Sequence, residues 1–208
     1  MTNPIWSIMT KIRRQLIEYD QQQHFLTDNL PLTENFDIRE YLPAEQNELL
    51  QNCNIYGFTM IHVDRWQSLK KGVKIADVSQ TRVEYISLRL HDEKLQPLPL
   101  VAIIHTFLHE LAHAITIPEQ HYSRHLSRRL QKLQPMIDNS GKSHKFVPCH
   151  HSNSFYRNFA KILRIAEKLQ IYQLPSTHRN FTIKNIQRYD SMINPSDKIS
   201  LGTTSIII

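Results

Sequence analysis

One helical segment constrains the fold of this chain more than any other part of its sequence. From Leu100 to Thr116, apolar residues recur at helical spacing. They form a single stripe: Ile104, Leu108, Leu111 and Ile115. Within this apolar pattern stand His109, Glu110 and His113. Because the two histidines are four residues apart, their side chains project from one helical face about one turn apart.

The pattern His109-Glu110-Leu-Ala-His113 is an H-E-x-x-H motif. Both imidazoles can reach a single Zn²⁺, and the small side chains of Ala112 and Ala114 leave room near the metal. Glu110 is rotated by one residue and lies beside the metal rather than on it. There it can take a proton from the metal-bound water and pass it to a leaving amine. The motif therefore favours a catalytic zinc site over two ordinary helix histidines.

A catalytic zinc site needs a third protein ligand. A metzincin is disfavoured, because Thr116 and Glu119 replace the Gly and the third His of the extended motif. Glu167, the acidic residue of the next predicted helix, lies more than three turns past that helix's start. The remaining candidates are His121, His125, His144, His150 and His151. His150 and His151 directly precede the next helix, and on this reasoning both stay open. His105, one turn before His109, is expected to be a core or hydrogen-bonding residue.

Other segments carry weaker patterns. Helices are predicted over 5–19, 45–50 and 154–172, strands over 55–63 and 83–90, and a turn at 92–94. Residues 152–154 (Ser-Asn-Ser) are good N-cap types for the helix at 154–172. Residues 117–150 are expected to be irregular, and the last 35 residues are weakly patterned, with the end at 206–208 folding back onto the domain. The fold class predicted is α+β.

The motif, together with His151-Ser-Asn-Ser-Phe155, resembles the SprT-like and WLM zinc metallopeptidases. The stretch from Phe155 to Tyr172 is similar in particular to WLM-like proteins encoded by large DNA viruses. The resemblance implies a minimal zincin-like fold, a small mixed sheet packed on the H-E-x-x-H helix and a second helix. It also implies Zn²⁺ as cofactor, a protein substrate, His151 as the third ligand and Phe155 packed behind it.

The chain departs from the family in the length of one connection, because 37 residues separate His113 from His151. This predicts an insertion at about 117–148. The expected organisation is an N-terminal helix with polar loops over 1–54, a metallopeptidase core over 55–172 and a C-terminal extension over 173–208.

Charge is distributed unevenly along the chain. Residues 1–120 have a net charge of −4, whereas residues 121–208 have a net charge of +10. Residues 121–145, called the basic segment below, hold six basic side chains and one acidic one. Such charge favours contact with phosphates. The candidate nucleic-acid contacts are Arg124, Arg128, Arg129 and Lys132.

Composition excludes several classes of protein. The 4 glycines are too dispersed for a phosphate-binding loop, and 2 cysteines cannot build a disulfide framework or a four-thiolate zinc site. Basic residues at 11, 13 and 14 interrupt the N-terminal apolar stretch, which disfavours a signal peptide. No apolar run of 18 residues occurs, so no membrane span is expected. We expect an intracellular protein, in the cytoplasm or nucleus or packaged in a virion.

Two functional hypotheses follow. The first is a zinc-dependent endopeptidase of the SprT/WLM type acting on DNA-associated proteins, with Glu110 as base and His109, His113 and His151 as ligands. The alternative is a non-catalytic structural or nucleic-acid-associated protein, such as a virion component, that retains a zincin fold. Glu110 favours the enzyme, because a purely structural zinc ion has no use for that carboxylate.

Overall fold

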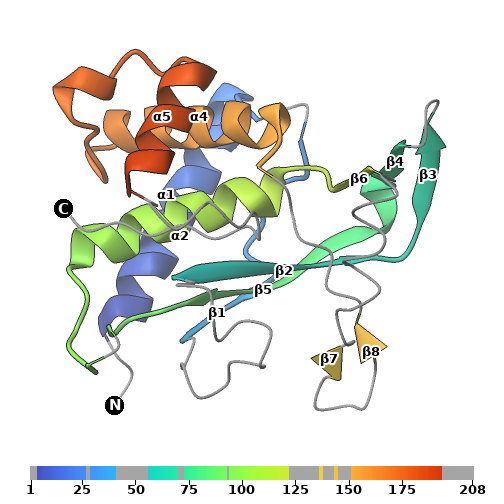
Figure 1. Ribbon diagram of the computed structural model, residues 1–208, viewed down its shortest axis with the longest axis horizontal. Helices are drawn as coiled ribbons and strands as arrows, with labels where there is room; N and C mark the ends of the chain where they lie inside the picture. The colour runs from blue at the N-terminus through green and yellow to red at the C-terminus, as the bar shows by residue number, and fades with distance from the viewer. Residues whose placement is uncertain are drawn as a thin grey trace.

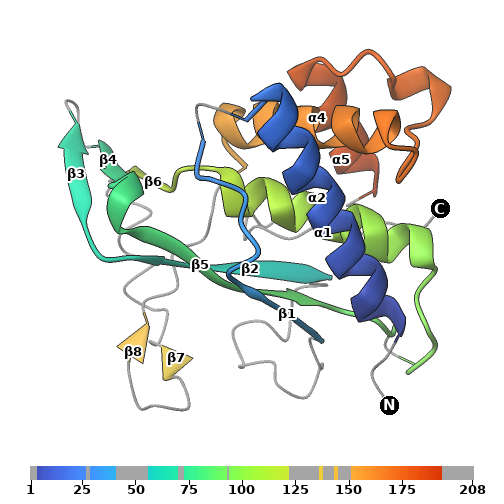
Figure 2. The same cartoon turned by 180° about the vertical axis from the view of Figure 1, so that it is seen from behind.

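The helix that carries the motif, α2 (Leu100–Ile115), lies between a β-sheet and a second layer of helices (Figures 1 and 2). The computed structural model describes residues 4–26, 29–40, 56–69, 73–92, 94–121, 136–137, 143–144 and 151–193. Most α2 side chains are buried, because the sheet covers one face and α4 (Asn153–Lys168) covers the opposite one. The predicted helix at 100–116 is confirmed.

The sheet beneath α2 is small and mixed, as expected. Its strand order is β1 (Asp37–Glu40), β5 (Thr81–Leu88) and β2 (Gly57–Val63), with β1 parallel and β2 antiparallel to β5. The strands predicted at 55–63 and 83–90 are confirmed as β2 and β5. The mixed α+β class is therefore confirmed.

A second sheet lies beyond the end of β2. It consists of β3 (Trp66–Leu69), β4 (Val73–Ala76) and β6 (Glu119–His121), all antiparallel. The 3-10 helix η2 (Val78–Gln80) connects β4 to β5. β6 falls in a region expected to be irregular, as does the pair of β7 (Met136–Ile137) and β8 (Ser143–His144). Their pairing depends on partners distant in sequence, which local patterns do not reveal.

Two further helices confirm the sequence patterns. α1 (Pro4–Gln23) extends the predicted helix at 5–19. α4 begins where its N-cap was expected, since Ser152 Oγ accepts a hydrogen bond of 3.2 Å from the Phe155 amide. It ends four residues before the predicted end at 172. Gln170 adopts a positive φ of 56°, and the Ile171 amide bonds to the Ala166 carbonyl, a geometry that closes a helix.

The weakly patterned end of the chain contains the 3-10 helix η3 (Ser176–His178) and a helix that was not predicted, α5 (Ile183–Ile193). α5 packs on α4, and its Ile186 and Tyr189 are buried in the common core. That core also takes in residues of α1, such as Met9 and Leu16. The hydrophobic core thus draws on all three segments distinguished in the sequence.

Some predictions fall outside the described residues: the helix at 45–50, the end at 206–208 and most of the insertion at 117–148. The turn predicted at 92–94 includes residue 93, which is outside the described residues; on either side of it, Asp92 Oδ1 accepts hydrogen bonds from the amides of Lys94 and Gln96. Within the described part of the chain, each helix is too short or too polar to cross a lipid bilayer.

Candidate metal centre

His109 and His113 lie on the buried side of α2, facing the start of α4. Both side chains are almost fully excluded from solvent. Their Nε2 atoms are 3.2 Å apart, because residues four apart on a helix stand one above the other. The helix therefore directs two imidazoles at one point, as the motif predicts.

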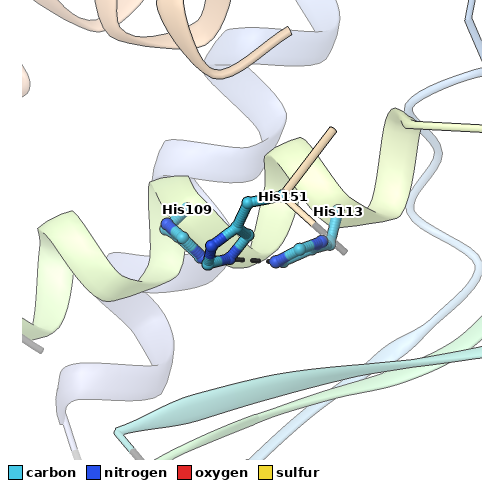
Figure 3. A group of neighbouring side chains, drawn as sticks. All are labelled: His109, His113 and His151. Carbon is cyan, nitrogen blue, oxygen red and sulfur yellow. Dashed lines mark hydrogen bonds between the residues drawn. The ribbon is translucent and has the colours of Figure 1, made fainter. Parts of the chain in front are cut away.

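His151 approaches the same point from the residue before the N-cap of α4. Its Nε2 atom lies 3.1 Å from His109 Nε2, and the three rings converge in Figure 3. Since Ser152 caps α4 at the next position, the backbone at His151 is held by a helix terminus rather than by a free loop. The structure thus brings together the three residues expected to bind the metal.

The spacing of these nitrogens suits one tetrahedral ion. Zn–N bonds of about 2.0–2.1 Å place adjacent ligands roughly 3.3–3.4 Å apart at tetrahedral angles. The observed Nε2–Nε2 separations of 3.1 and 3.2 Å are close to that value. Three imidazole nitrogens also form a donor set that zinc accepts, with a fourth position left for water. The residues present therefore fit a zinc ion.

Phe155 packs against all three imidazoles. Its ring is stacked on His113 at 4.2 Å between centroids and on His151 at 4.6 Å, and lies 4.8 Å from His109. Phe155 is fully buried. It excludes water from behind the cluster and limits rotation of the rings, in the place that the family resemblance implies.

The other candidate ligands are not part of this cluster. Glu167 lies near the far end of α4 and forms an ion pair with Arg179 at 3.2 Å. The side chains of His121, His125, His144 and His150 are outside the described residues. Among the described His, Cys, Asp and Glu side chains, His109, His113 and His151 form the group that could hold a metal.

Glu110 points from α2 toward β2. Its Oε2 atom accepts a hydrogen bond of 2.7 Å from the Thr59 hydroxyl, whose oxygen is also 2.9 Å from the Glu110 carbonyl. Gly57 allows this approach, since a Cβ there would lie 3.0 Å from Glu110 Cγ and 2.8 Å from Thr106 Cγ2. One edge strand therefore both holds the carboxylate and makes room for it.

Burial sets the charge state of this site in the metal-free protein. It raises the pKa of Glu110 to about 8, an effect that the Thr59 hydrogen bond opposes. Glu110 Oε1 has no hydrogen-bond partner among the described residues. Burial also lowers the pKa of His109 and of His113 well below the usual value, so both imidazoles stay neutral, the form that binds metal.

A buried carboxylate, Asp190 of α5, lies behind His109. Its Oδ1 atom is 3.5 Å from His109 Nδ1, and its Oδ2 accepts a hydrogen bond of 3.1 Å from the Tyr156 hydroxyl. Burial raises the pKa of Asp190 to about 6, against the effects of the nearby His151 and the Tyr156 hydrogen bond. The Tyr156 hydroxyl is thereby engaged with Asp190.

A chain of buried polar groups fixes α5 against α2. His105 Nδ1 is 2.9 Å from the Tyr172 hydroxyl, which is 2.7 Å from the hydroxyl of Tyr189. The ring of His105 also packs edge-on against Phe159. His105 is thus a hydrogen-bonded core residue, as expected.

Thr59 and Asp190 were not among the residues predicted from the sequence. Thr59 stood in a correctly predicted strand, but only tertiary structure shows that it faces Glu110. Asp190 lies in a segment without a clear secondary-structure pattern. The available signal in the sequence was a lone acidic residue in a basic region. The four basic residues expected to bind nucleic acid, Arg124, Arg128, Arg129 and Lys132, lie outside the described residues.

Comparisons with protein-family models, with curated proteins and with solved structures find no match to this chain. The fold and the site therefore define it as a mixed α+β protein with a buried three-histidine cluster able to hold a metal.

Proposed function

We propose that this protein is a zinc-dependent endopeptidase of the SprT/WLM type. The observation that carries the proposal is the convergence of three Nε2 atoms beside a buried glutamate one residue along the same helix. The Nε2 atoms of His151 and His113 lie 3.1 and 3.2 Å from that of His109. A structural zinc site usually has four protein ligands, whereas three nitrogens leave a position for water or substrate.

In this proposal His109, His113 and His151 hold the metal, and Phe155 keeps their rings in place. Zinc, when bound, lowers the pKa of a water ligand and polarises the scissile carbonyl. Glu110 accepts the proton of the attacking water and delivers it to the leaving amine. Thr59 orients the carboxylate for this transfer by its hydrogen bond to Oε2.

Glu110→Gln separates catalysis from metal binding. The amide has nearly the same size but cannot accept the proton, so we expect zinc content and fold to be retained and proteolysis to fall by orders of magnitude. The experiment measures zinc by elemental analysis and digestion of casein or histones, with and without DNA. Equal digestion by the variant contradicts the proposal. Zinc binding without digestion under any of these conditions favours the alternative, a non-catalytic structural protein.

The choice of third ligand has its own test. We expect His151→Ala to lose most of the zinc and His150→Ala to retain it. The converse result assigns the third position to His150, which would require a different arrangement at the start of α4.

We further propose that the protein substrates are associated with nucleic acid. The basic segment supplies a local charge of +5. Support also comes from α4, whose basic residues recur at helical spacing on one side and are exposed or half-buried: Arg157, Lys161, Arg164 and Lys168. Both segments adjoin the histidine cluster in sequence. Phosphate contacts of this kind bind nucleic acid without strong sequence preference.

A further inference from the structure

Asp190 occupies an unusual position for a carboxylate. Its side chain is fully buried. Among the described residues, Oδ2 accepts a hydrogen bond from Tyr156, whereas Oδ1 has no hydrogen-bond partner. Burying a carboxylate with so little compensation costs free energy, so buried charges are normally paired or placed at metal sites. Here the atom without a hydrogen bond is the one next to the candidate metal centre.

The two nitrogens of His109 face opposite environments. Nε2 lies 3.1 Å from His151 Nε2 and 3.2 Å from His113 Nε2, on the side where the ligand nitrogens meet. Nδ1 lies 3.5 Å from Asp190 Oδ1 on the other side. A histidine can bind metal through Nε2 only when that nitrogen carries no proton, and in the neutral ring the proton then resides on Nδ1. An acceptor beside Nδ1 favours this tautomer.

The structure also holds Asp190 in place. Tyr156, which binds Oδ2, lies in the first turn and a half of α4, close to His151 in sequence. The neighbouring residue, Tyr189, is hydrogen-bonded to Tyr172, which in turn contacts His105 one turn before His109 on α2. Asp190 is therefore fixed relative to both helices that supply the ligands.

From this arrangement we infer that Asp190 is a positioning residue of the metal centre: it orients His109 and selects the tautomer that presents Nε2. Helix α5 is then an essential part of the metal centre, although it lies more than 30 residues beyond His151. The inference rests on the proposed metal site, but not on peptidase activity.

The test compares three full-length variants. In Asp190→Asn the side chain keeps its size but loses its charge, and its amide group can present a donor instead of an acceptor to His109. Ile186→Val is the matched control, because it removes one buried methyl group of α5 and leaves the polar side chains of that helix unchanged. Tyr156→Phe removes the group that holds Oδ2. Zinc affinity is measured by competition with a chromophoric chelator, and stability by urea unfolding of the metal-free proteins.

Partners that orient a metal-binding histidine typically change metal affinity by roughly 10–100-fold when mutated. We expect a loss of that size for Asp190→Asn, a smaller loss for Tyr156→Phe and little change for Ile186→Val. The metal-free Asp190→Asn protein should unfold at a urea concentration no lower than the wild type, since a buried charge has been removed. A merely structural role would lower stability and affinity together.

A second readout is the ¹⁵N chemical shift of His109 in the zinc-loaded wild type, which should show a protonated Nδ1. Zinc affinity of Asp190→Asn within twofold of wild type, or an equal loss in Ile186→Val, overturns the inference. If the proposed function is wrong but the inference is right, zinc affinity depends on Asp190 and no protein substrate is cleaved. If the wild type binds no zinc, both are wrong.

Discussion

Gly57→Ala tests whether the close approach of β2 to α2 controls the position of Glu110. The added Cβ would lie 2.8 Å from Thr106 Cγ2, 3.0 Å from Glu110 Cγ and 3.2 Å from Glu110 Oε1. These separations are shorter than a normal van der Waals contact between such atoms. Neither element can easily move away. Gly57 is paired with Leu88 in the sheet, and Thr106 is buried and hydrogen-bonded to the Ala102 carbonyl.

Overpacking a well-packed core by one methyl group typically costs about 1–3 kcal/mol. With a urea m-value of about 2 kcal/mol per molar, the midpoint of unfolding should fall by roughly 0.5–1.5 M. The methyl group also crowds Glu110 Cγ and Oε1, so the carboxylate held by Thr59 should be displaced. We therefore expect lower peptidase activity with unchanged zinc content, measured on the same preparations.

Thr106→Ser provides the compensating change, because it removes the methyl group nearest to the new Cβ while keeping the hydroxyl. The double variant Gly57→Ala/Thr106→Ser should recover part of the lost stability, whereas Thr106→Ser alone should be mildly destabilising. The contacts with Glu110 remain in the double variant, so activity should recover less than stability does. An unchanged urea midpoint in Gly57→Ala, or no recovery in the double variant, would refute this reasoning.

Three further predictions concern the same region and its surroundings. Thr59→Val, which replaces the hydroxyl by a methyl group, should retain zinc and lower peptidase activity by about 10-fold or more. A tenfold loss corresponds to about 1.4 kcal/mol of transition-state stabilisation. Thr59→Ser, which keeps the hydroxyl, should remain close to wild type. The metal-free protein should lose stability as the pH falls below about 6.5, because the unfolded chain binds protons at His105, His109 and His113 that the folded state does not bind. Each of these three histidines contributes up to about 1.4 kcal/mol per pH unit, and the raised pKa values of Glu110 and Asp190 offset part of that loss. A urea midpoint that does not decrease between about pH 6.5 and about pH 5 would contradict this. If four to six residues of the basic segment contact duplex DNA, the logarithm of affinity should fall with the logarithm of salt concentration at a slope of roughly −4 to −5. Reversing the four candidate contacts to Glu should flatten that slope in fluorescence anisotropy without changing zinc content, and unaltered binding would remove nucleic acid from the proposal.

Local sequence patterns predicted much of the scaffold that carries the site. Three of these patterns are properties of neighbouring residues: the apolar period of α2, the Ser152 cap of α4 and the alternation in β5. Such patterns favour a local backbone conformation with little contribution from contacts to the rest of the chain. The pairing of His109 with His113 is of the same kind, because helix geometry alone places residues four apart on one face. Bringing His151 to them relied on a family resemblance, since spacing by itself left His150 as an equal candidate.

The remaining features depend on contacts between distant parts of the chain. Thr59 meets Glu110 across 51 residues, and β1 pairs in parallel with β5 across a similar distance. Asp190 reaches His109 from a helix whose sequence pattern is weak, because much of what holds α5 is its packing on α4 and a buried chain of tyrosines. The sequence by itself thus determined which helix carries the two motif histidines and the glutamate. Only the tertiary structure decided which strand holds that glutamate and which carboxylate lies behind His109. The reason is that burial and long-range packing, unlike helical periodicity, produce no local pattern in the sequence.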